Sequence, residues 1–95
     1  MDVTGLIWLR RIVEKLAQKH GVSQQEVGEV MANRPQIRWV EKGDRPGENL
    51  YSALGRTNSG RYLIVFFIYK KDRRALIISA RDMSAAERKR YEKKR

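Results

Sequence analysis

The sequence has no cysteine and only one histidine among its 95 residues. Without cysteine, disulfide bonds and thiolate metal sites are excluded, and a reducing compartment suits the chain. One histidine cannot build a histidine-rich metal centre, and the carboxylates lack the loop spacing of a site for a hard cation. The sequence therefore predicts no bound metal and no cofactor.

Long hydrophobic runs are also missing. The longest apolar stretch, Tyr62 to Tyr69, is far shorter than the roughly 20 residues of a membrane-spanning helix. Near the N-terminus, Arg10 and Arg11 follow the apolar residues, which reverses the order found in a signal peptide. We therefore expect a cytoplasmic protein without a membrane partner, folded as one domain over residues 1–95.

Positive charge is abundant. Twenty-one lysines and arginines against eleven acidic residues give a net charge of +10. Small basic domains gather polyanions, most often nucleic acid and sometimes an acidic protein or a lipid surface. The apolar fraction of 41% suits a folded protein with a modest core.

The first third of the chain has the period of helices. Residues 4–20 are predicted to form one helix that ends at Gly21, because apolar side chains recur at steps of three and four. Residues 23–34 are predicted to form a second helix, which Ser23 and Glu26 begin as a capping box. The first apolar stripe consists of Leu6, Leu9, Val13 and Leu16.

The rest of the chain changes to the period of strands. Strands are predicted at 36–41, 50–57, 61–69 and 75–81, with a loop at 42–48 and a hairpin turn at Asn58-Ser59-Gly60. Ser84 and Glu87 form a second capping-box pattern, which begins a C-terminal helix. The predicted class is α+β: two N-terminal helices, a four-stranded mainly antiparallel sheet and a C-terminal helix.

Arginines near strand ends are the main candidates for function. Alternation places Arg81 on the same face as Ala75 and Ile77, and the two neighbouring strands carry Arg56 and Arg61. We expect these cations to converge in one pocket, where guanidinium groups beside an aromatic ring suit RNA phosphates and bases. Arg81, at the end of a buried strand, is the strongest candidate.

His20 is the one side chain whose ordinary pKa lies near neutrality. A capping role at the helix end is the simpler interpretation. The functional alternative is a general acid or base in RNA cleavage. Arg73 and Arg74 lie in a turn, where charges that promote solubility are the simpler interpretation.

Several motifs together resemble a known family. The C-terminal block is the most specific of them, and Ile7-Trp8 also falls at a suitable distance before the histidine. The motifs are His20-Gly21-Val22-Ser23, Gly47-Glu48, Ala53-Leu54-Gly55-Arg56, Gly60-Arg61, and Ile77-Ile78-Ser79-Ala80-Arg81 followed by Glu87-Arg88 and Tyr91. In these residues the chain resembles the BrnT toxins of bacterial type II toxin–antitoxin systems.

The resemblance implies a RelE-like fold, metal-independent cleavage of RNA and growth arrest by the free toxin. It also implies a BrnA-like antitoxin with a ribbon-helix-helix part, through which alone the complex would contact operator DNA. By position, the implied catalytic residues are His20, Arg56, Arg81 and Tyr91, and Glu48 is a further candidate. The RNA-binding candidates are Lys19, Arg61, Arg74 and Arg88.

A second hypothesis stays open, namely a basic module of the same fold that binds RNA or an acidic partner without cutting it. The family often has polar residues where this sequence has apolar ones, at Leu9, Ile12, Leu16 and Leu50. RNA cleavage in the presence of a chelator favours the first hypothesis. Salt-sensitive binding without cleavage or toxicity favours the second.

Overall fold

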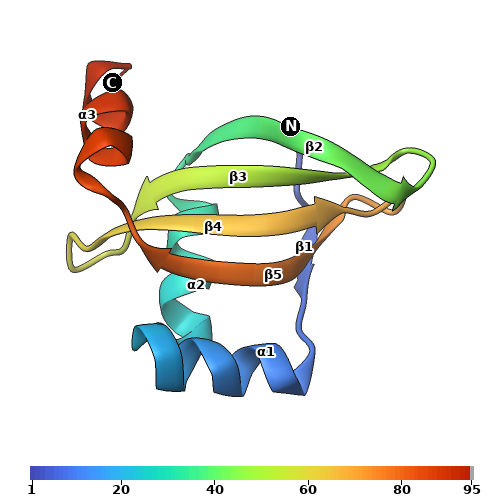
Figure 1. The fold of residues 1–95 in the computed structure, drawn as a ribbon, viewed down its shortest axis with the longest axis horizontal. Helices are drawn as coiled ribbons and strands as arrows, with labels where there is room; N and C mark the ends of the chain where they lie inside the picture. Colours follow the sequence, from blue (N-terminus) through green and yellow to red (C-terminus); the bar gives the residue numbers. More distant parts are fainter. Residues whose placement is uncertain (95) are drawn as a thin grey trace.

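The computed structural model describes residues 1–94. Its strands form one mixed sheet in the order β1-β5-β4-β3-β2, in which only β1 and β5 run parallel. Figure 1 shows α3 at the end of the sheet where β3 and β5 finish, far from α1. The elements are β1 Gly5–Ile7, α1 Arg10–Lys15, the π-helix η1 Leu16–His20, α2 Gln24–Ala32, β2 Gln36–Arg45, β3 Glu48–Arg56, β4 Tyr62–Tyr69, β5 Arg74–Asp82 and α3 Ala85–Lys93.

The N-terminal segment differs from the prediction of a single helix over residues 4–20. Its first residues form β1, which pairs with the start of β5 and adds a fifth strand to the four predicted. The Thr4 amide also donates to the Arg73 carbonyl at 3.0 Å. Backbone pairing with a sheet edge here outweighs the helical spacing of the side chains. Gly21 ends the helical part as predicted, with a left-handed φ of 59°.

The edge strand β2 is longer than predicted. It continues to Arg45, and β3 begins at Glu48, so the predicted loop at 42–48 reduces to the turn at Pro46-Gly47. Gly47 has a φ of +78°, which glycine adopts without steric cost. Two register shifts in β2 allow this charged segment to remain paired with β3.

The sheet separates two apolar clusters. On one face, α1, η1 and α2 cover Leu63, Val65 and Phe67, which are fully buried. On the other face, α3 covers one end of the sheet, where Leu54, Ile64 and Tyr91 form a smaller cluster. We call these the helix-covered face and the α3 face. Both capping boxes, at Ser23 of α2 and at Ser84 of α3, are present as predicted.

A bulge in β5 determines where Arg81 lies. Phe66 pairs with Ser79 and Phe67 with Ile77, so Ile78 is an extra residue in β5. An extra residue reverses the alternation of faces beyond it. Ile77 is therefore buried under the helices, whereas Arg81 lies on the α3 face, opposite Ile64. The prediction that these two residues share a face is wrong.

Candidate nucleic-acid interface

Most of the predicted site residues gather at one end of the sheet, but on both of its faces. β3 ends there, β4 begins there and β5 ends there. The α3 cluster, on the α3 face, comprises Arg56, Tyr62, Arg81, Arg88 and Tyr91. The Arg61 cluster, on the helix-covered face, comprises His20, Gly21, Glu26, Arg61 and Asp82. The arginines therefore do not converge in one pocket, which corrects that expectation.

Arg81 is held by the residue that caps the following helix. Its Nη1 and Nη2 donate to the two Glu87 carboxylate oxygens at 2.8 and 2.9 Å, and Nη1 also donates to the Asp82 carbonyl at 3.1 Å. The Glu87 carboxylate also accepts from the Ser84 amide at 2.8 Å. Arg81 is thus locked to the start of α3. Its Nε, on another edge of the guanidinium, donates to no residue of the described chain.

The charge of Glu87 is strongly favoured at this point. The Arg81 hydrogen bond, assisted by the Ser84 amide, lowers the pKa of Glu87 from 4.5 to about 2, although partial burial opposes the shift. The same hydrogen bond raises the pKa of Arg81. The two side chains therefore form a stable charged pair, and Arg81 keeps one donor, Nε, that bonds to no residue within 1–94.

Arg56 and Arg88 contact the same aromatic ring, that of Tyr62. Their Cζ atoms lie 4.5 and 3.9 Å from the ring centroid. Arg56 donates through Nε and Nη2 to the Gly60 carbonyl at 3.3 Å, and Arg88 Nε lies 3.7 Å from a Glu92 oxygen. Arg56 Nη1 and both Arg88 Nη atoms donate to no residue within 1–94. These donors are available to an anion.

Tyr91 lies beneath this surface rather than on it. Its side chain is 5% exposed, its ring meets the Tyr62 ring edge-on at 6.0 Å, and its carbonyl accepts from Gln36 Nε2 at 2.7 Å. Tyr62 is the ring that the arginines contact, and it was not among the predicted site residues. The hairpin contained the signal, because a turn at 58–60 places Tyr62 directly opposite Arg56.

Arg61 uses every one of its five N–H groups within the protein. Nε and Nη2 donate to the Asp82 carboxylate at 2.8 and 3.1 Å, and Nη2 also donates to the His20 carbonyl at 3.1 Å. Nη1 donates to the Gly21 carbonyl at 2.8 Å and to Glu26 at 3.2 Å. Arg61 thereby ties η1 and α2 to the sheet. Its contact with RNA remains a prediction, and a phosphate would have to replace one of these partners.

His20 lies at the end of η1, beside the Arg61 cluster. Its positive form adds to the lowering of the Asp82 pKa, after the larger effect of the Arg61 hydrogen bond. Lys19 precedes it and is exposed. His20 therefore lies on the helix-covered face, at the end of β5. Arg81 lies at the same end of β5 but on the α3 face.

Two candidates lie at the opposite end of the sheet. Arg74 begins β5 and pairs with Asp72 at 2.8 Å, roughly 20 Å along the strand from Arg81. Glu48 begins β3 and pairs with Lys70 at 2.8 Å, and this hydrogen bond lowers the pKa of Glu48. The structure does not bring either residue to the α3 cluster.

Of the four apolar positions where the resemblance implies polar residues, two have a structural role. Ile12 and Leu16 are 8% and 1% exposed and belong to the core under the sheet. Leu9 is 37% exposed at the start of α1. Leu50 lines a shallow hollow with Ile68 and Ile78. Two of the four positions therefore contribute packing instead of polar groups.

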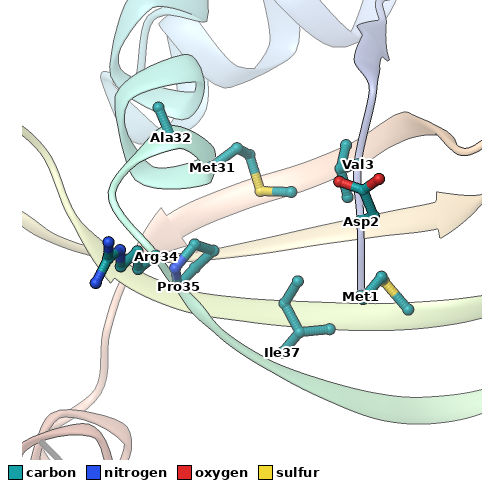
Figure 2. A pocket seen from close by; sticks show the side chains of 8 residues that line it. All are labelled: Met1, Asp2, Val3, Met31, Ala32, Arg34, Pro35 and Ile37. Atoms are coloured by element: carbon teal, nitrogen blue, oxygen red, sulfur yellow. The ribbon is translucent and has the colours of Figure 1, made fainter.

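The hollows of the surface lie apart from most of these residues. One of about 420 Å³ lies between the N-terminal segment and the link from α2 to β2, and Met31, Val3 and Ile37 line it (Figure 2). Another of about 530 Å³ lies beside α3 and is lined in part by Tyr91 and Gln36.

Among the helices within residues 1–94, none combines the length and the apolar composition of a membrane span.

A basic domain that collects guanidinium groups and aromatic rings at one edge has the features of a nucleic-acid-binding protein. The chain matches, over residues 10–87, the family model described as the ribonuclease toxin BrnT of type II toxin–antitoxin systems. It therefore belongs to this family, and the resemblance seen in the sequence is confirmed. The matched region includes Arg56, Tyr62 and Arg81 and ends before Arg88. A comparison with curated proteins found no match.

Proposed function

We propose that this toxin is a metal-independent endoribonuclease with a RelE-like fold that acts in the cytoplasm and arrests growth. A BrnA-like ribbon-helix-helix antitoxin would neutralise it and carry all contact with operator DNA. Membership of the ribonuclease toxin family supports the reaction class. The observation that carries the assignment of the site is the set of unused guanidinium N–H groups on the α3 face, beside the end of β5.

The proposed reaction is attack of a ribose 2′-oxygen on the adjacent phosphorus. The 2′-hydroxyl loses its proton, the new P–O bond forms a cyclic phosphate, and the leaving 5′-oxygen gains a proton. Negative charge builds up on the phosphorane-like transition state, where fixed cations stabilise it. Arg81 and Arg56 would bind the scissile phosphate through the N–H groups that their protein partners leave unused.

The remaining candidates would serve proton transfer and substrate binding. His20 would move a proton, and Arg61 would fix its backbone through the hydrogen bond to the His20 carbonyl. Tyr91 would orient the substrate through its edge contact with Tyr62. Lys19 and Arg88 would bind the strand on either side of the cleaved bond.

Cleavage of an end-labelled RNA by the purified toxin in EDTA tests this function. The wild-type protein should cut, and His20→Ala and Arg81→Ala should cut much more slowly and should relieve toxicity on expression in cells. Co-expression of the antitoxin should restore growth. Cleavage that EDTA abolishes would contradict the metal-independent route, and intact RNA in all samples would contradict the enzyme.

The second candidate function is RNA or partner binding without cleavage. The burial of Ile12 and Leu16 favours it, because two positions where the resemblance implies polar groups here supply the core. This alternative predicts RNA binding that weakens steeply with salt, no cleavage and no toxicity. The assay above separates the two functions.

A further inference from the structure

Tyr62 joins charged side chains from two separate elements. Arg56 comes from the end of β3, and Arg88 comes from α3, yet both guanidinium groups contact the Tyr62 ring. The Tyr62 hydroxyl donates to Glu92 at 3.3 Å, and Glu92 is also the partner of Arg88 at 3.7 Å. The result is a compact unit of two cations, one ring and one anion, at the same end of the sheet as Arg81.

We propose that Arg56, Tyr62 and Arg88 form a second phosphate subsite, which binds the backbone phosphate of single-stranded RNA next to the scissile one, with the two N–H groups of Arg56 Nη1 shared between the two phosphates. Tyr62 is a positioning residue in this subsite, because it acts through the two arginines. The inference rests on the proposed function, in that RNA is the substrate. It adds a residue and a subsite that the motifs did not indicate.

The Tyr62 ring restricts the conformations of the two arginines before an anion binds. Long arginine side chains lose conformational freedom when they bind an anion, and a guanidinium stacked on an aromatic face has already lost much of it. Both arginines are fixed on one ring, while Arg56 Nη1 and both Arg88 Nη atoms keep no hydrogen-bond partner within residues 1–94. This geometry fits the several oxygens of one phosphate.

In the protein without RNA, the Glu92 carboxylate is the anion that pairs with Arg88. Its carboxylate is half exposed and lies at a long 3.7 Å from Arg88, which makes it a weak partner that a phosphate can displace. Its like charge also repels an incoming phosphate. Removal of this charge should therefore strengthen RNA binding, whereas removal of the ring or of Arg88 should weaken it.

The test measures binding of a short fluorescent RNA, 2′-O-methylated so that it cannot be cut, by anisotropy at several salt concentrations. Tyr62→Leu should raise Kd about 5- to 10-fold, while Tyr62→Phe, which keeps the ring, should stay within about twofold. Arg88→Gln should raise Kd and reduce the slope of log K against log salt by about 0.7. Glu92→Gln should lower Kd.

The matched control is Arg11→Gln, which removes one exposed charge from α1, the helix on the other face. It should change Kd less than Arg88→Gln does. With cleavable RNA, Tyr62→Leu and Arg88→Gln should both raise KM, and Arg88→Gln should leave kcat within about threefold, because Arg81 and Arg56, which are proposed to bind the scissile phosphate, keep their own contacts. A general loss of folding would lower the active fraction and spare KM.

The subsite would be overturned if Arg88→Gln kept the wild-type affinity and salt slope, or if a folded Tyr62→Leu variant kept the wild-type KM. Either result would leave the proposed ribonuclease activity in place. Arg88→Gln and Glu92→Gln keep this decision open if Tyr62→Leu does not fold, because both side chains are at the surface. Variants that bind RNA normally but lose the antitoxin would likewise overturn it. A wild-type protein that neither binds nor cuts RNA would refute the proposed function itself.

Discussion

The two arginine clusters at the end of the sheet have the same residue type but opposite states. On the helix-covered face, Arg61 donates all its N–H groups to two carboxylates and two carbonyls. On the α3 face, Arg56, Arg81 and Arg88 each keep donors without a partner within residues 1–94. The comparison teaches that the donors left unused, more than the presence of arginine, separate a surface that can bind phosphate from a structural anchor.

The largest expected effect concerns catalysis on the α3 face. Arg81→Ala should slow RNA cleavage at saturating substrate by about 100- to 1,000-fold, as expected when a group that stabilises transition-state charge is removed. Folding should survive, because Ser84 and Glu87 still cap α3. Single-turnover kinetics with a circular dichroism control measures this. A loss below tenfold in a folded variant would remove Arg81 from the catalytic machinery.

The matched change on the other face should affect stability instead. Arg61→Ala leaves Glu26 and Asp82 without their partner and exposes two carbonyls, so unfolding free energy should fall by about 2 kcal/mol. For a domain of this size, Tm should fall by roughly 10 °C. Urea denaturation measures the first quantity. RNA affinity of the folded variant should change less than threefold, and a stable Arg61→Ala that no longer binds RNA would break the comparison.

The pH dependence of stability should reveal the pair that links Arg81 to α3. The pKa of Glu87 is about 2 in the folded protein against an ordinary 4.5, so its contribution is full above about pH 5 and is lost as pH falls towards 2. The shift corresponds to about 3 kcal/mol, which solvent screening reduces to about 1–2 kcal/mol. Urea unfolding of wild type and Glu87→Gln from pH 2 to 6 measures it. The two curves should converge at low pH, and a constant difference would contradict the pair.

The smallest expected effect distinguishes a loss of stability caused by backbone strain from a loss of RNA affinity. Gly60 has a φ of +96°, and an added Cβ would lie 2.8 Å from Arg56 Nη2, whereas Gly47, with a φ of +78°, has only a lysine carbon at 3.8 Å. Gly60→Ala and Gly47→Ala should each cost about 1 kcal/mol of stability. Only Gly60→Ala should weaken RNA binding, by a few-fold, because it displaces Arg56. Equal Kd values for the two variants would separate Arg56 from the interface.

Local signals in the sequence predicted much of the fold. The capping boxes at Ser23 and Ser84, the hairpin turn at 58–60 and the apolar central strand are short-range patterns, and the structure contains each of them. β1 escaped prediction because its three residues fall within a helical period and pair only with β5. The bulge at Ile78 has no local signature, and it moved Arg81 to the other face.

The motifs of the sequence named candidate residues, whereas their arrangement in space could not be predicted. The family motifs identified Arg56 and Arg81, and both lie at the same end of the sheet. The role of Arg61 depends on Glu26 and Asp82, which are 35 and 21 positions away in the chain. Its hydrogen bonds therefore could not be predicted from residues close to it in the sequence. Tyr62 was missed because its importance comes from its contact with Arg88 of α3, which only the packed helix creates.

The most direct measurement follows the guanidinium N–H resonances of the arginines, both Nε–H and Nη–H, by NMR as an uncleavable 2′-O-methyl RNA is added. Phosphate bound on the α3 face should shift the signals of Arg56, Arg81 and Arg88, and the Arg61 signals should stay in place, because all five of its N–H groups remain bonded within the protein. A shift of Arg61 equal to that of Arg81, or no shift of the three α3-face arginines, would contradict the division of labour between the two clusters.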